Sequence, residues 1–165
     1  METQGRLIVD LARLPDGGED YEGELSPEAS DLADVSNVCM PLGGVCYDVF
    51  VEQVDHELLV RGRVSQLFRG LCCRCGEKFD LNVEDPAYFA DYPVEETVAF
   101  VDLTPEMREA IILALPGYPV CREGCKGLCT RCGANLNREA CSCGSVQAGS
   151  LGRIDLPAHV SIRRE

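Results

Sequence analysis

Four closely spaced pairs of cysteines constrain this chain more than any other feature. The pairs are Cys72 with Cys75, Cys121 with Cys125, Cys129 with Cys132, and Cys141 with Cys143. A close pair places two sulfur atoms on one metal ion, and a tetrahedral Zn²⁺ ion takes four such ligands. The cysteines therefore predict two closed zinc sites. Because a closed site offers no coordination position to a substrate, we expect both metals to be structural.

Two arrangements of the four pairs are compatible with the spacing. In the first, the last two pairs form a local site, and the pair at 72 and 75 shares a second ion with the pair at 121 and 125. In the alternative, the cysteines between 121 and 132 hold one ion, and the first and last pairs hold the other. We favour the first arrangement, because only eight residues separate Cys132 from Cys141. Four thiolates would also accept iron, but nothing in the sequence indicates a redox partner.

The number of cysteines and the N-terminal sequence together indicate the cellular compartment in which the protein is expected. The chain of 165 residues has 11 cysteines, which would suit a disulfide scaffold in a secreted protein. Its N-terminus lacks a basic segment followed by a long apolar run, and residues 110–115, the most apolar stretch, are too short to span a bilayer. We therefore expect a cytoplasmic protein with reduced thiols and no membrane contact. Cys73 is predicted to be a bystander, and Cys39 and Cys46 are predicted to be free thiols that act as small apolar residues in a partly buried region. A thiol redox sensor is the alternative role for these three cysteines.

The charge of the chain is strongly negative but unevenly distributed. The formal net charge is −13, and residues 1–60 hold 14 of the 28 acidic side chains. Basic residues gather near the cysteines, and we predict contacts with RNA or a protein partner for Arg61, Arg63, Arg69, Arg74, Lys126 and Arg131. The competing interpretation is that these side chains offset the thiolate charge. An acidic surface repels phosphate and attracts basic proteins, so a basic ribosomal protein is an equally suitable partner.

Alternating apolar residues predict a set of β-strands. Residues 7–14 resemble a short edge strand, and residues 19–36 are acidic and indicate a loop or a short helix after Ser26-Pro27. Residues 45–68 alternate on both sides of a polar turn at Asp55-His56, which predicts a hairpin. A further strand is expected around residues 79–83, and a weaker one around 98–103.

One helix is expected after this sheet. Thr104 is predicted as its N-cap and Pro105 as its first residue, and Pro116-Gly117 ends it. An apolar stripe at helical spacing is predicted to face the core, namely Met107, Ala110, Ile111, Ala114 and Leu115. The fold class is therefore α+β, with an antiparallel β-sheet, one main helix and a Cys-rich, zinc-binding C-terminal part.

Several of these segments together resemble a known family. They are Asp102-Leu103-Thr104-Pro105, residues 108–116, Cys125-Lys126-Gly127-Leu128-Cys129, residues 132–137 with the sequence C-G-A-N-L-N, and Cys141-Ser142-Cys143. Upstream, Cys72-x-Arg74-Cys75 also matches. The chain is similar to the YceD family, whose members are described as large ribosomal RNA subunit accumulation proteins. On this resemblance residues 1–143 form a single domain, with residues 1–44 matched loosely and residues 118–143 as the zinc knuckle region. Residues 144–165 are then a linker and tail.

The resemblance implies a function in ribosome biogenesis. Members are expected to be needed for accumulation of large-subunit (23S) rRNA, which implies as partner a large-subunit precursor, through its rRNA or a basic ribosomal protein. The eight paired cysteines are carried over as metal ligands. No nucleotide-binding loop, dinucleotide fingerprint or nucleophile elbow occurs in the sequence. We therefore expect a non-enzymatic protein without catalytic residues or a small-molecule substrate, and a protein-interaction module unrelated to ribosomes is the alternative.

Overall fold

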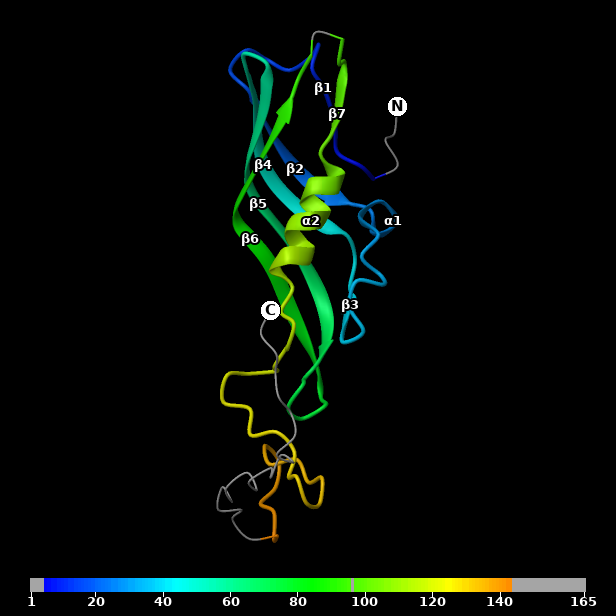
Figure 1. Ribbon diagram of the computed structural model, residues 1–165, viewed down its shortest axis with the longest axis vertical. Helices are drawn as coiled ribbons and strands as arrows, with labels where there is room; N and C mark the ends of the chain where they lie inside the picture. The colour runs from blue at the N-terminus through cyan, green and yellow to red at the C-terminus, as the bar shows by residue number, and fades with distance from the viewer. Residues whose placement is uncertain (1–4, 96, 144–165) are drawn as a thin grey trace, which may run out of the picture.

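A five-stranded antiparallel sheet forms the body of the protein (Figure 1). The computed structural model describes residues 5–95 and 97–143. Strands β2 (Glu19–Leu25), β4 (Val45–Val54) and β5 (Glu57–Leu71) lie in that order, and β3 (Cys39–Pro41) pairs with the far end of β5. Strand β6 (Lys78–Pro93) pairs with the other edge of β5 along its whole length. The antiparallel sheet agrees with the predicted fold class.

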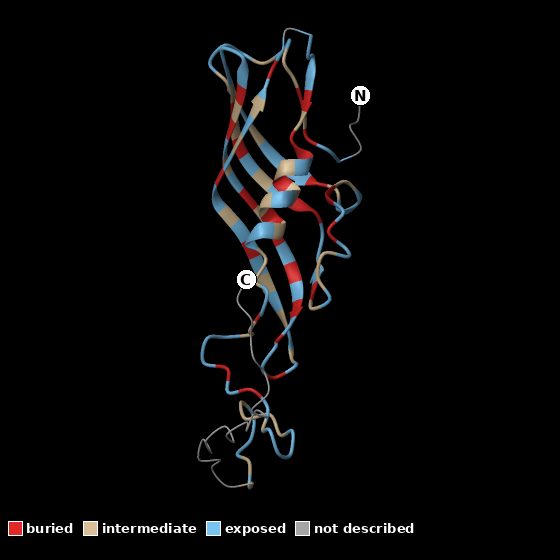
Figure 2. Cartoon of the chain, in the orientation of Figure 1, coloured by how far each residue is buried: buried red, intermediate tan, exposed pale blue. Residues whose placement is uncertain are grey.

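The β4–β5 hairpin confirms the prediction from alternating residues. Val54 pairs with Glu57 across the turn, and Asp55 adopts a positive φ of 53°. Along β5 the buried side chains alternate with exposed ones, as Figure 2 shows. Leu58, Val60 and Phe68 are fully buried on the inner face. The period of two in the sequence therefore reports which face of this strand meets the core.

Helix α2 (Thr104–Ala114) packs against β5 and β6. Met107 and Ile111 are fully buried in the core, as their spacing predicts, but Ala114 is exposed. Thr104 is not the N-cap, because Leu103 occupies that position and no side chain caps the helix. The Thr104 hydroxyl instead accepts a hydrogen bond from the backbone N–H of Leu7 at 3.2 Å. The predicted cap is wrong because this long-range contact takes up the hydroxyl.

The N-terminal part differs most from its prediction. Residues 19–25 form strand β2, although their sequence indicates a loop, because pairing with β4 holds this edge strand in place. The short helix α1 (Pro27–Ser30) is confirmed, and the Ser26 side chain caps it by accepting from the Ala29 N–H at 3.1 Å. Strand β1 (Ile8–Asp10) is shorter than predicted. It pairs with β7 (Phe100–Asp102) in a separate two-stranded sheet, so the weak strand predicted around 98–103 lies outside the main sheet.

The Cys-rich part continues from the end of α2 beyond the tip of the β5–β6 hairpin (Figure 1). Within residues 117–143 there is no helix or strand, only turns and one isolated bridge between Leu128 and Asn135. The predicted linker and tail, residues 144–165, lies outside the described residues. In the part of the chain that the structure describes, each helix is too short or too polar to cross a membrane.

Candidate metal centres

The eight paired cysteines come together as two groups of four. Site 1 contains Cys72, Cys75, Cys121 and Cys125, and site 2 contains Cys129, Cys132, Cys141 and Cys143. Within each group all sulfur atoms lie within 4.8 Å of one another. This grouping corresponds to the first of the two arrangements that the spacing allows. Site 1 connects the tip of the β5–β6 hairpin to the segment after α2, whereas site 2 is local.

The sulfur geometry fits a metal ion. The Sγ atoms of Cys72 and Cys125 are 3.7 Å apart, and those of Cys75 and Cys121 are 3.8 Å apart. Four sulfurs at about 2.3 Å from a tetrahedral ion would be separated by about 3.8 Å. Site 2 is tighter, with 3.2 Å between the sulfurs of Cys129 and Cys141 and 3.5 Å between those of Cys132 and Cys141. Both donor sets therefore fit a closed tetrahedral thiolate site.

The two C-x2-C pairs form the same backbone turn. The N–H of Gly76 donates to the Cys72 carbonyl at 2.8 Å, and that of Gly133 donates to the Cys129 carbonyl at 2.9 Å. Both glycines have a positive φ, 70° and 74°, which glycine adopts without the steric cost that a Cβ atom brings. Each pair thus forms a tight knuckle in which backbone N–H groups surround the first cysteine.

An arginine in each knuckle spans its own site. Arg74 Nη1 donates to the Cys125 carbonyl at 3.2 Å, and Arg131 Nη1 donates to the Cys143 carbonyl at 3.3 Å. In both sites the acceptor belongs to the last cysteine of the group. The repeated sequence C-x-R-C-G, at 72–76 and 129–133, was the signal for this equivalence. Arg74 and Arg131 are predicted to contact RNA or a partner. In the structure, each guanidinium donates a hydrogen bond to the backbone carbonyl of a cysteine in its own group of four.

The thiols of site 2 have pKa values shifted in opposite directions. Backbone N–H groups of Cys132 and Arg131 lower the pKa of Cys129 to about 6. Hydrogen bonds with the sulfurs of Cys141 and Cys132 raise the pKa of Cys143 to about 12. Deprotonation of Cys129 is therefore favoured, whereas deprotonation of Cys143 is opposed by the neighbouring sulfurs. A divalent cation removes that opposition, because metal ligation requires deprotonated thiols.

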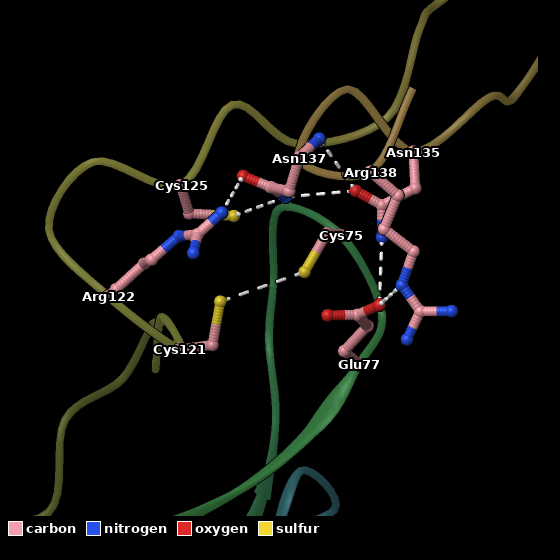
Figure 3. A network of polar contacts seen from close by, with 8 residues as sticks. All are labelled: Cys75, Glu77, Cys121, Arg122, Cys125, Asn135, Asn137 and Arg138. Carbon is pink, nitrogen blue, oxygen red and sulfur yellow. Dashed lines mark hydrogen bonds and ion pairs between the residues drawn. The ribbon is translucent and has the colours of Figure 1, made fainter.

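A network of polar side chains joins the loop between the two cysteine pairs of site 2 to site 1 (Figure 3). Asn137 Nδ2 donates to the Cys125 sulfur at 3.3 Å, while its Oδ1 accepts from the Lys126 N–H at 2.8 Å and from Arg122 Nη2 at 3.0 Å. Asn137 Nδ2 also donates to Oδ1 of Asn135, at 2.9 Å. Asn137 therefore contacts a predicted ligand directly, a role that the spacing of the cysteines does not predict.

Asn135 extends this network to the sheet. Its Nδ2 donates to Glu77 Oε1 at 3.0 Å, and Arg138 Nε forms an ion pair with the same oxygen at 2.5 Å. Glu77 directly precedes β6, so the network reaches the β5–β6 hairpin. Both asparagines belong to the motif C-G-A-N-L-N at 132–137, which is one of the segments that resemble the family. This motif is the sequence feature that could have indicated their role beside site 1.

Replacing Asn137 with alanine should weaken metal binding at site 1. The change removes a hydrogen bond to the Cys125 sulfur and two that hold the surrounding loop. Outer contacts of this kind typically contribute about 10–100-fold to metal affinity, and we expect about tenfold here. Competition with a chelating dye measures the effect. Asn82→Ala, at an exposed asparagine of β6, is the matched control, and equal affinity in both variants would contradict the assignment.

Site 1 has a small apolar cluster of its own. Cys72, Cys75 and Cys125 are buried together with partly buried Phe79 and Val120. This cluster is separate from the main core, which contains the side chains of the sheet and α2. The Cys73 N–H donates to the Pro119 carbonyl at 2.9 Å, so the two sides of site 1 also meet through the backbone. Few apolar contacts therefore support the C-terminal part of the described chain.

Of the other predicted contact residues, Arg61, Arg63 and Arg69 lie on β5, whereas Lys126 directly follows Cys125 of site 1. Arg61 forms an ion pair with Glu52 at 3.3 Å and lies over the Phe50 ring, and Arg63 forms one with Asp48 at 3.4 Å. Arg69 forms an ion pair with Asp80. Lys126 is exposed, and no side-chain partner is found for it among the described residues. The structure therefore does not gather the six residues on one basic surface.

The three bystander cysteines have different environments. Cys39 is fully buried, and burial raises the pKa of its thiol. Cys46 and Cys73 are exposed, so the partly buried environment expected for Cys46 is wrong. Cys46 lies on the solvent-facing side of β4, where alternation along the strand directs its side chain away from the core.

The comparisons with known proteins establish the family. The family model for the large ribosomal RNA subunit accumulation protein YceD matches residues 60–150, more than half of the chain. The chain belongs to the YceD family. The matched range contains β6, α2 and both groups of cysteines. A search of solved structures finds no match.

Curated relatives of this YceD protein occur in plants and mycobacteria. It is 39% identical over 58 residues to the chloroplastic large ribosomal RNA subunit accumulation protein YCED homolog 1 of Arabidopsis thaliana, covering 33% of this chain and 18% of the relative. The maize protein of the same name is 34% identical over 74 residues, or 44% of this chain and 24% of the relative. An uncharacterised protein of Mycobacterium tuberculosis is 31% identical over 106 residues, or 56% and 51%. The chain thus spans about half or less of these relatives.

Proposed function

We propose that this YceD protein is a non-enzymatic, cytoplasmic factor for biogenesis of the large ribosomal subunit, required for accumulation of its 23S rRNA. The family match over the cysteine-bearing half carries the proposal, because its description names large-subunit RNA accumulation. The two closed groups of cysteines support a structural role in that process. A site with four protein ligands has no open position at which a substrate could coordinate.

Zinc is the metal that best suits these sites. In site 1 the sulfurs of Cys72, Cys75, Cys121 and Cys125 would hold one ion, and those of Cys129, Cys132, Cys141 and Cys143 would hold the other. A bound Zn²⁺ ion would neutralise part of the thiolate charge and hold distant chain segments together. Zinc is favoured over iron because it has no redox chemistry and prefers closed tetrahedral thiolate sites in structural roles.

A basic ribosomal protein is a better partner than rRNA for the described surface. Arg61, Arg63 and Arg69 each lie beside a carboxylate, which cancels much of the potential that would attract a phosphate. The side chains of Arg74 and Arg131 donate to carbonyls in the metal sites. Lys126 remains available for RNA. The net charge of −13 also favours a positively charged partner.

Depletion of this protein should lower the ratio of large-subunit to small-subunit rRNA. A factor required for large-subunit biogenesis leaves its rRNA unprotected when it is absent, whereas the small-subunit rRNA should stay at its normal level. The ratio can be measured on total cellular RNA, and expression of the wild-type chain should restore it. An unchanged ratio in depleted cells would refute the proposed function.

A further inference from the structure

A groove runs between β6 and α2 on the side of the sheet away from β4. Its volume is about 570 Å³, and it is lined by residues 84, 85 and 88–91 of β6 and by residues 106, 109, 110, 113 and 114 of α2. Five carboxylates contribute to this lining: Glu84, Asp85, Asp91, Glu106 and Glu109. Lysine and arginine are absent from the described residues that line it. The groove is therefore a concentrated region of negative charge.

These carboxylates have no basic partners within the described part of the chain. None of the five takes part in an ion pair there, in contrast to Glu52, Asp48 and Asp80 on the outer face of the sheet. Arg108, the basic residue of α2, is directed elsewhere, because its guanidinium donates to the Asp31 carbonyl at 3.1 and 3.3 Å. Glu106 accepts a hydrogen bond from the Tyr92 hydroxyl at 2.9 Å, and Asp85 accepts one from the Ala87 N–H at 3.1 Å. Because neither donor is charged, the net negative charge of the groove is not neutralised by these contacts.

Two large apolar side chains lie among the carboxylates. Phe89 of β6 is 62% exposed and Leu113 of α2 is 78% exposed, and both line the groove. Exposed apolar side chains that line a charged groove are typical of interaction sites, because a partner that covers them removes apolar surface from water. A simple cation would not use these side chains. The occupant should therefore carry both positive charge and an apolar group.

The edge of β6 also favours an extended occupant. Among the described strands β6 pairs with β5 alone, so its other edge is free (Figure 1). A free strand edge can form backbone hydrogen bonds with an added peptide strand.

We propose that this groove binds an extended, lysine- and arginine-rich segment of a basic protein, with an apolar side chain placed against Phe89 and Leu113. The proposal rests on the function proposed above and names the class of partner that the protein would hold. RNA is disfavoured as the occupant, because five carboxylates would repel its phosphates.

A synthetic peptide tests this proposal with the full-length, zinc-loaded protein. The probe is a fluorescent peptide of about eight residues in which lysine alternates with leucine, long enough to run beside residues 84–91. Fluorescence anisotropy should report saturable binding that weakens as salt is raised from about 0.1 to 1 M. A peptide with glutamate in place of lysine should not bind. Equal binding of the two peptides, or binding only of an rRNA transcript, would overturn the proposal.

Matched variants locate the binding site. Glu84→Gln with Glu109→Gln should weaken peptide binding about tenfold, because two solvent-exposed ion pairs are lost. Phe89→Ser should weaken it about fivefold through lost apolar contact. The control is Asp16→Asn with Asp34→Asn, which removes the same charge at exposed positions outside the groove. An equal loss in the control would mean that net charge alone attracts the peptide and would refute the groove.

Complementation of depleted cells separates this proposal from the proposed function. If the wild-type chain restores the rRNA ratio and the Glu84→Gln, Glu109→Gln variant does not, both proposals are supported. If the variant also restores the ratio, the groove has no part in the function, which itself stands. If depletion leaves the ratio unchanged, the proposed function fails, and the peptide measurements alone decide whether the groove binds a basic segment.

Discussion

Replacing Cys125 with serine should abolish metal binding at site 1 and unfold the segment between α2 and site 2, while site 2 keeps its metal. Cys125 is buried in site 1, and its sulfur accepts a hydrogen bond from Asn137. The metal content should fall from two ions per chain to one, as the two groups of cysteines imply. Structural zinc contributes apparent binding free energies of about 10–16 kcal/mol in small knuckles, which is comparable to the stability of a whole domain.

The physical reason for this large effect is the weak apolar support of residues 117–143. The cluster around site 1 holds few apolar side chains, and this segment forms neither a helix nor a strand. Without the metal, little remains to offset the conformational entropy of the ordered loop. Trypsin should then cleave rapidly at Arg122 and Lys126, which lie between α2 and site 2.

The control for this experiment is Cys73→Ser. Cys73 lies between two predicted ligands but is exposed and belongs to neither group of four. It should keep both metals and the protease resistance of the wild type. Metal analysis of the two variants measures the number of bound ions, and limited proteolysis measures whether the segment between α2 and site 2 is folded. Retention of two ions by Cys125→Ser would contradict the grouping of cysteines at site 1.

Replacing Phe68 with alanine should have the opposite pattern, with a large loss of stability in the sheet and no loss of metal. Phe68 is fully buried in the main core, where it is the largest side chain of that kind. Truncation of a buried phenylalanine leaves a cavity and costs about 3–5 kcal/mol. Urea unfolding followed by circular dichroism should show the midpoint shifted downward, while the zinc content should stay at two ions per chain.

Leu67→Ala provides the matched control, because Leu67 neighbours Phe68 on β5 but is 43% exposed on the other face of the strand. Its effect should stay near or below about 1 kcal/mol. If Phe68→Ala also released zinc, the sheet core and the metal region would unfold as one cooperative unit. The two apolar clusters would then not correspond to separately stabilised parts. Loss of stability without loss of metal would support two separately stabilised parts.

Local patterns in the sequence were sufficient wherever a few neighbouring residues decide the structure. The β4–β5 hairpin, the Ser26 cap of α1 and the burial of Met107 and Ile111 all depend on contacts close in the chain or on a simple period. The same reasoning failed for β2, whose acidic residues carry little periodicity. Strand β2 is an edge strand, and its structure comes from hydrogen bonds to β4 rather than from its own preference.

The sequence by itself determined that this protein has paired cysteines at metal-ligand spacing, an antiparallel hairpin and one amphipathic helix, because each feature lies within a short window of the chain. Tertiary structure decided which pairs meet, since Cys75 and Cys121 are 46 residues apart and only the chain path brings their sulfurs within 3.8 Å. It also directed Arg74 and Arg131 toward cysteine carbonyls and placed the carboxylates of β6 and α2 around one groove. These arrangements depend on the packing of distant segments, and spacing along the chain carries no information about the direction of a side chain in space.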